Sequence, residues 1–165
     1  MQHEITTVRP LLDSRGVLLE PGYSKGLLPQ YSRSAIKGGA LRIKEWDYYL
    51  ITCDDFAVAL TIADNSYMGL DSISLLDFRI PWEHTTSPMS FLTLGKRNFP
   101  SSSASGNVKS GGRHHKISFE LHGDYRLLTF HMDKFFDGKP IDGEMQLWVQ
   151  FDKTPIKPFG LPDTT

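Results

Sequence analysis

The chain has 165 residues, of which 39% are hydrophobic and 22% charged, and its formal net charge is -1. This length suits one domain with its own core. The nearly balanced charge excludes nucleic-acid binding driven by bulk positive charge. Aromatic residues make up 12% of the chain, which favours strands and pocket linings over helical bundles.

The cysteine content and the hydropathy pattern indicate a soluble protein. Cys53 is the single cysteine, so no intrachain disulfide forms, and we interpret it as a partly buried, reduced thiol. A reduced thiol is typical of the cytoplasm, and residues 1–7 have no signal-peptide pattern. No apolar run approaches the roughly 18 residues that a membrane span needs. We therefore expect a cytoplasmic protein without a membrane span.

Residues 1–39 are expected to form an N-terminal hairpin and a connection. Two short apolar pieces flank the segment 13–16, Asp-Ser-Arg-Gly, whose residue types favour a hairpin turn. Pro21 and Gly22 then end the second strand. The remaining residues are mixed in character, with one helical turn expected near 32–36.

A long strand is predicted at 40–53, and its two faces do not alternate cleanly. One face is apolar at both ends and carries Glu45 and Asp47 in the middle, whereas the other is basic, then aromatic, then apolar. A strand with charges on a face that it otherwise buries either contains a bulge or lines a polar cavity. Both interpretations remain open.

Two further strands are predicted at 56–63 and 67–78, so that three strands joined by tight turns form a meander. Composition then favours a loop at 79–90 and a short strand at 91–94. The Ser- and Gly-rich segment 100–113 is predicted to be a flexible loop inside the domain, because the strand pattern resumes directly after it.

The clearest hairpin pairs 117–122 with 125–130 across Gly123 and Asp124, which suit a type II′ turn. This loop sets a register in which His122 faces Tyr125 and Ile117 faces Phe130. Turns are predicted at 137–140 and 141–143, and a last strand at 145–151. Together these elements predict an all-β, mainly antiparallel meander that closes into a barrel or a strongly curved sheet, with its β core at 40–155 in a single domain of 1–165.

Two sequence blocks, 42–49 (RIKEWDYY) and 59–69 (ALTIADNSYMG), resemble the domain-of-unknown-function family 2804, and 38–41 and 111–113 fit it loosely. The resemblance covers most of the chain. It implies a β-rich, lipocalin-like barrel and supplies no reaction. It also implies members about twice this length, so that this chain matches roughly the N-terminal half and forms part of a larger two-part protein.

Three carboxylates are candidates for acid–base catalysis. Glu45 and Asp47 share a strand face about 6–7 Å apart, close enough for one pKa to rise. The alternative is that they form cross-strand ion pairs on a solvated face. Asp64, followed by Asn65 and Ser66, is a third candidate, although the same residues have turn chemistry of their own.

The candidate ligand-binding residues combine charge with aromatic rings, which also occur in cores and barrel walls. They are Arg42, Lys44, Trp46, Tyr48, Tyr49 and Tyr67. No metal site or cofactor is predicted, because His114 and His115 point to opposite faces of a strand. The register does place His114 near Asp133, which shares a face with His131.

Three functions fit these features. The first is a binding domain for a small apolar or amphipathic ligand, because the strands are rich in aromatics and carry no catalytic motif. The second is a hydratase, isomerase or hydrolase that acts on a lipid-like substrate through these carboxylates. The third is a structural half that pairs with a C-terminal domain and self-associates without it.

Overall fold

The computed structural model describes residues 3–148. Contacts within the chain divide these residues into two units, 3–37 and 38–148. No helix in the described part of the chain has the length and apolar character needed to cross a membrane.

The first unit contains little regular structure. Strands β1 (Arg9–Pro10) and β2 (Pro29–Gln30) pair in parallel, and a 3-10 helix, η1, spans Arg33–Ala35. The predicted turn at 13–16 is confirmed, because Asp13 Oδ1 accepts hydrogen bonds from the backbone N–H groups of Arg15 and Val17. The helical turn expected near 32–36 is also present.

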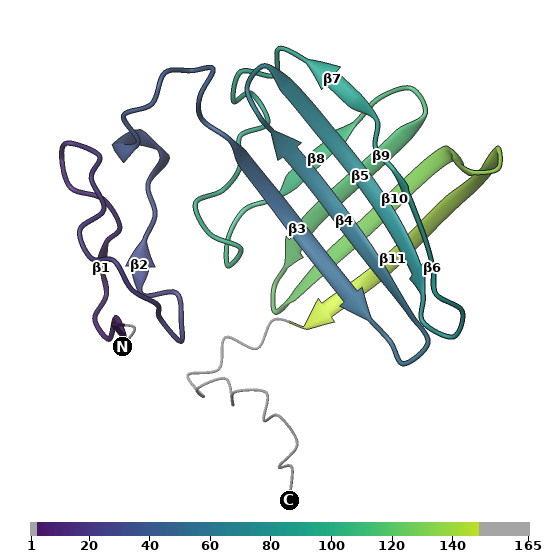
Figure 1. Cartoon of the computed structure of the whole chain (residues 1–165), viewed down its shortest axis with the longest axis horizontal. Helices are drawn as coiled ribbons and strands as arrows, with labels where there is room; N and C mark the ends of the chain where they lie inside the picture. The colour runs from purple at the N-terminus through teal and green to yellow at the C-terminus, as the bar shows by residue number, and fades with distance from the viewer. Residues whose placement is uncertain (1–2, 149–165) are drawn as a thin grey trace, which may run out of the picture. The chain divides into compact units, whose positions relative to one another are not determined.

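The second unit is built from two antiparallel sheets (Figure 1). The first sheet has the order β3-β4-β5-β6, with β7 also paired to β5; its strands are β3 (Glu45–Thr52), β4 (Phe56–Asp64), β5 (Met68–Asp77), β6 (Trp82–Thr86) and β7 (Met89–Phe91). The second has the order β11-β10-β9-β8; its strands are β8 (Val108–Gly111), β9 (His115–His122), β10 (Tyr125–Phe136) and β11 (Lys139–Trp148). The prediction of an all-β, antiparallel fold is confirmed.

Tight turns between sequence neighbours set the register of both sheets. The predicted meander is present as β3, β4 and β5, and the predicted hairpin of β9 and β10 pairs His122 with Tyr125 and Ile117 with Phe130. Gly123 has φ +61°, which the first central position of a type II′ turn requires. The β10–β11 turn uses Asp137 and Gly138, both with positive φ, as a type I′ turn requires.

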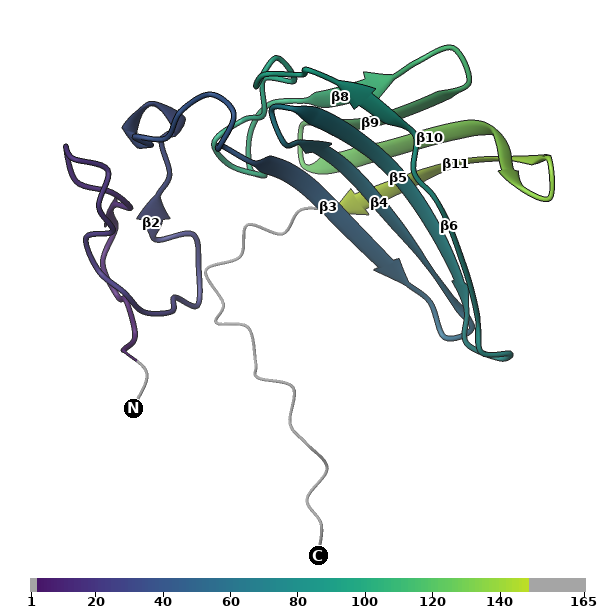
Figure 2. The ribbon, with the colours of Figure 1, turned by 45° about the horizontal axis from the view of Figure 1, so that its top comes forward.

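The core of the second unit lies between the two sheets (Figure 2). Leu60 and Ile73 from the first sheet and Phe119 and Leu128 from the second are each 0% exposed. Within residues 38–148 the strands form two separate sheets, so the closed barrel, one of the two forms that the sequence predicted beside a strongly curved sheet, is not found there. Strands β3 and β11 therefore each keep one edge without a strand partner in this part of the chain.

Several predicted boundaries are wrong. Residues 40–44 precede β3 instead of belonging to it, and β6 occupies the predicted loop at 79–90. Strand β8 lies inside the predicted flexible loop at 100–113, which shortens that loop. Strand β11 runs through the predicted turn at 141–143, since the hairpin turn is complete at Gly138. Residues 149–151 of the predicted last strand lie outside the described residues.

Candidate functional site

The face of β3 that carries both acidic and apolar side chains points into the second unit. Glu45, Asp47, Tyr49 and Ile51 are each partly buried, whereas the residues between them are exposed. The pairing of β3 with β4 runs from Glu45 to Thr52 without a register shift. The described strand therefore contains no bulge, and its acidic residues lie on the face that packs against the core.

Asp47 is a partly buried carboxylate that the fold leaves without a partner. It makes no hydrogen bond or ion pair with any residue between 3 and 148. Burial raises the pKa of Asp47, and the nearby positive charge of Arg126 opposes that rise. Burial likewise raises the pKa of Tyr49, whose ring packs edge-on against Phe119 with centroids 4.7 Å apart. The Tyr49 hydroxyl also has no hydrogen-bond partner in the described chain.

Arg126 supplies the positive charge beside these groups. It is 2% exposed and donates hydrogen bonds to the carbonyl oxygens of Ser103 (2.6 Å), Gly106 (3.3 Å) and Phe119 (3.4 Å). These three hydrogen bonds use part of its five N–H donors, and carbonyl oxygens do not neutralise its charge. The same bonds anchor the Ser-rich loop to β10, so this loop is attached to the core at two of its residues.

Strand β11 contributes the other half of this region. Arg126 pairs across the sheet with Leu147, and Leu128 pairs with Met145. Both β11 side chains pack against the core and stay partly exposed, as do Tyr49 and Ile51 of β3. Figures 1 and 2 both show the end of β11 beside β3. We call this region the inner margin; its residues are Asp47, Tyr49, Ile51, Arg126, Met145 and Leu147.

The structure does not bring all of the predicted ligand-binding residues together. Tyr49 belongs to the inner margin, but Trp46 and Tyr48 lie on the outer face of the same strand and are 63% and 53% exposed. Arg42 is exposed and precedes β3. Lys44 contacts Tyr67, with its ammonium 4.4 Å from the ring centroid and 3.2 Å from the hydroxyl. These residues therefore occupy both faces of β3, the segment before it, and the turn between β4 and β5.

Asp64 lies at the end of β4 and organises a turn. Its Oδ1 accepts hydrogen bonds from the Ser66 N–H (2.8 Å) and the Thr93 hydroxyl (2.6 Å), and its Oδ2 accepts one from the Arg97 N–H (3.4 Å). Burial alone would raise the pKa of Asp64, but these hydrogen bonds together lower it. A carboxylate held ionised by the chain in this way is a structural anchor more readily than a proton donor.

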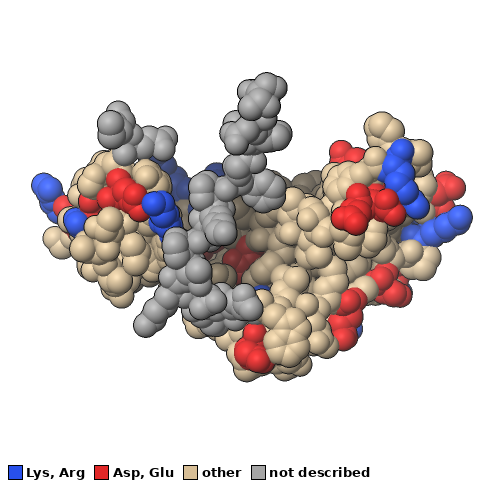
Figure 3. Space-filling model, turned by 90° about the horizontal axis from the view of Figure 1, so that it is seen from below, with Lys and Arg blue, Asp and Glu red and all other residues tan. Residues whose placement is uncertain are grey.

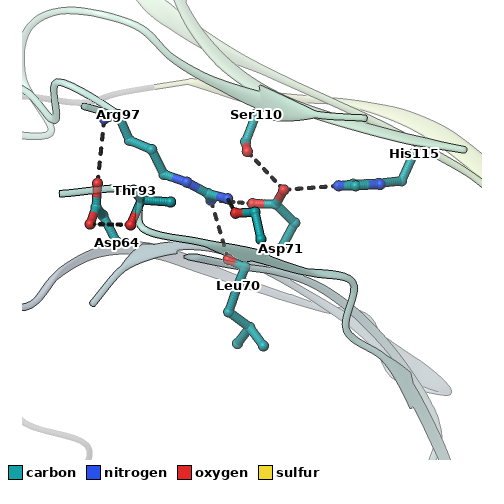
Figure 4. Close-up of polar contacts among 8 residues, drawn as sticks. Asp64, Leu70, Asp71, Thr93, Arg97, Ser110 and His115 are labelled. Carbon is teal, nitrogen blue, oxygen red and sulfur yellow. Dashed lines mark hydrogen bonds and ion pairs between the residues drawn. The ribbon is translucent and has the colours of Figure 1, made fainter. Parts of the chain in front are cut away.

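A buried polar cluster joins the two sheets (Figure 4). Asp71 of β5 is 3% exposed; one of its oxygens pairs with the Arg97 guanidinium, and the other accepts hydrogen bonds from Ser110 (2.7 Å) and His115 (2.9 Å). Gly69 makes room for this arrangement, since a Cβ there would lie 2.6 Å from Arg97 Nη2. We call these four residues, Asp71, Arg97, Ser110 and His115, the polar joint. Because Ser110 contacts the carboxylate rather than the imidazole, the joint is not a nucleophilic triad.

The remaining candidate groups are exposed. His114 Nδ1 and His131 Nε2 each lie 2.8 Å from Asp133, as the predicted register requires. No cluster of three or more metal-ligating side chains is present in residues 3–148. Cys53 is exposed, so the prediction of a partly buried thiol is wrong. Figure 3 shows basic and acidic side chains interspersed on the face in view, with no large patch of one sign.

Sequence reasoning missed Arg126 and Asp71. Both could have been found from register: Arg126 lies two residues before Leu128 on the buried face of its hairpin, and Asp71 lies two residues before Ile73 on the buried face of β5. A charged residue on a buried face indicates a paired or functional group. Their partners could not have been found in this way, because Ser103, Arg97 and His115 are distant in sequence.

Comparison with known proteins identifies a family. The family model described as a domain of unknown function (DUF2804) matches residues 2–155, which is most of the chain. No curated protein and no solved structure matches it.

Proposed function

The chain belongs to this family of domains of unknown function, and from the residues of its inner margin we propose that it binds a small amphipathic molecule there. The observation that carries the proposal is Asp47, a partly buried carboxylate that no described residue hydrogen-bonds. Burying a charge without a partner is costly. A ligand group that donates a hydrogen bond to this carboxylate would offset that cost.

The apolar surroundings support the same proposal. Leu60 and Ile73 of the first sheet and Phe119 and Leu128 of the second are fully covered. By contrast, Tyr49, Ile51, Met145 and Leu147 are only partly covered by the described residues. These four side chains offer aromatic and aliphatic surface beside a carboxylate and a hydroxyl. Sites for small molecules combine mostly apolar walls with a few polar groups in this manner.

The polar side chains of this region favour one chemical class for the polar end of the ligand. Asp47 faces inward and accepts no hydrogen bond from a described residue, whereas Arg126 already donates to three carbonyl oxygens. The polar end of the ligand is therefore an amine or a hydroxyl rather than a carboxylate. A positively charged ligand group makes a stronger hydrogen bond to the Asp47 carboxylate, whereas a negatively charged ligand group is repelled by it.

A series of decyl compounds tests this proposal. Calorimetric titration with decylamine, decanol and decanoate should give the affinity order amine, alcohol, carboxylate, with at least a tenfold gap between first and last. Ile51→Trp should fill the inner margin and weaken binding, whereas Leu50→Trp, on the exposed face of the same strand, should not. Urea midpoints would establish that both variants fold. Native mass spectrometry of the purified protein should show a copurified small molecule.

The proposal fails if none of the three compounds binds and no small molecule copurifies. It also fails if both tryptophan variants bind like the wild type. Asp47→Asn gives a second readout that does not depend on filling the margin. It should narrow the affinity gap between decylamine and decanoate, because the charge that distinguishes them is removed.

A second candidate function, an enzyme acting on a lipid-like substrate, is favoured by the raised pKa of Asp47. A carboxyl group protonated nearer to neutral pH is a better general acid. In this role Asp47 would donate a proton to a bound isomerase, hydratase or hydrolase substrate, with Tyr49 as its neighbour. Turnover of a bound ligand that Asp47→Asn abolishes, with binding of a neutral analogue retained, would favour the enzyme over the carrier.

A further inference from the structure

A groove of about 530 Å³ lies on the second sheet, along strands β8 and β9. Side chains from the outer face of that sheet, on the side opposite the core, line the groove; they include Lys109, Lys116, Ser118, Glu120 and Thr129. This volume lies within the usual range for small-molecule sites, about 300–1,000 Å³. The groove shares no residue with the inner margin.

The groove contains one positive charge that has no counter-charge among the described residues. Lys109 Nζ lies 2.9 Å from Glu120 Oε2, and this contact is the main cause that lowers the pKa of Glu120 and keeps it ionised. The two charges therefore offset each other. Lys116 makes no ion pair or hydrogen bond with any residue between 3 and 148. Its ammonium is available to an anion in the groove.

The hydroxyl groups of Ser118 and Thr129 lie on the groove floor, and the ionised Glu120 determines which of them donates each hydrogen bond. Ser118 Oγ donates its proton to Glu120 Oε1 at 3.0 Å, since an ionised carboxylate only accepts. The 2.7 Å contact between Ser118 and Thr129 must then be donated by Thr129. Thr129 Oγ1 keeps its acceptor lone pairs, so it can accept a hydrogen bond from a ligand hydroxyl.

Gly111 holds one wall of the groove close to its neighbour. A Cβ at this position would lie 2.7 Å from the carbonyl oxygen of His115 and 3.1 Å from Lys116 Cα. The backbone of β8 can approach β9 here only without a side chain. No side chain at Gly111 therefore projects into the space beside Lys116.

We propose that this groove, lined by Lys116 and Thr129, binds a small hydroxylated oxyanion, that is, a polyol with one phosphate or carboxylate group. The anionic group pairs with the Lys116 ammonium. A hydroxyl of the same ligand donates to Thr129 Oγ1. One unpaired cation and one free acceptor together select a ligand that has both groups, in preference to a bare anion or a neutral sugar.

Calorimetric titration of the full chain tests the proposal with four probes: glucose 6-phosphate, gluconate, glucose and inorganic phosphate. One or both of the first two should bind with a stoichiometry of one, at least tenfold more tightly than glucose or inorganic phosphate. The comparison of glucose 6-phosphate with gluconate distinguishes a phosphate from a carboxylate. Lys116→Met should weaken binding at least tenfold and Thr129→Val several-fold, while Lys139→Met, an exposed lysine on β11, should have no effect.

Absence of binding by both hydroxylated oxyanions would overturn the proposal. Equal binding of inorganic phosphate would overturn it as well, because the hydroxyl would then have no role. An equal loss in Lys116→Met and Lys139→Met would indicate bulk attraction rather than a site. Decylamine affinity should stay unchanged in all three variants, so the result is independent of the proposal for the inner margin.

Discussion

The polar joint and the inner margin both place a carboxylate and an arginine between the two sheets, yet they differ in how the fold treats them. At the polar joint both oxygens of Asp71 have partners from the chain itself. At the inner margin Arg126 bonds to carbonyl oxygens, and Asp47 has no partner among the described residues. A charge that the fold satisfies contributes to structure, whereas a charge that it leaves unsatisfied is available for a ligand.

The largest expected effect is at the polar joint. Asp71→Ala leaves the nearly buried Arg97 without its counter-charge and removes an acceptor from Ser110 and His115. Breaking a buried pair in this way costs about 3–5 kcal/mol of unfolding free energy. Urea denaturation should show a marked fall in the midpoint.

Asp133→Ala is the matched control for that variant. Asp133 also contacts two partners, His114 and His131, but all three side chains are exposed. Exposed pairs contribute little to stability, so Asp133→Ala should leave the urea midpoint nearly unchanged. Equal losses in Asp71→Ala and Asp133→Ala would show that the polar joint is not a structural connection between the sheets.

The second-largest expected effect is the loss of unfolding free energy when leucines on two neighbouring strands are replaced by alanine. Leu128→Ala, in the fully covered core, should cost about 2–5 kcal/mol of unfolding free energy. Leu147→Ala, in the inner margin, should cost less than half as much, because part of its surface is already in contact with solvent. The two urea midpoints measure the difference. A larger loss for Leu147→Ala would contradict the distinction between core and margin.

The smallest expected effect is the pH dependence at Asp47. Its pKa in the folded chain lies above the usual 3.8, so the folded state holds the proton more tightly than the unfolded state. The stability that this proton contributes is fully present below pH 3.8 and is lost as the pH rises through the raised pKa. Asp47→Asn should therefore gain stability relative to the wild type over that range, by a fraction of a kcal/mol because the side chain is partly exposed.

Asp77→Asn should change the dependence of stability on pH in the opposite direction. The side-chain hydrogen bond from Arg79 lowers the pKa of Asp77 to about 2, so the ionised form is favoured in the folded state. This contribution is present above pH 3.8 and is lost as the pH falls through about 2. Denaturation curves of both variants between pH 2 and 7 measure the two trends. Parallel trends in the two variants would contradict the different surroundings inferred for these carboxylates.

Local chemistry determined which elements could be predicted from the sequence. The β9–β10 register followed from Gly123 and Asp124 alone, because a two-residue turn fixes all later pairs. Strand β6 was missed because Pro81 and Pro88 flank it, and its pairing depends on β5. The polar joint was missed because its residues come from β5, β8, β9 and the segment before β8. Asp47 was identified as a candidate, but its neighbour Arg126 lies 79 residues away in the sequence.

The most direct test of the inner margin is an NMR titration of the methionine methyl groups with decylamine. Met145 lies in the inner margin, Met132 is 2% exposed in the core, and Met89 is 62% exposed on the outer face of the first sheet. We predict a saturable shift of the Met145 signal, while the Met89 and Met132 signals stay in place. A shift of Met89 without Met145 would contradict the proposed site.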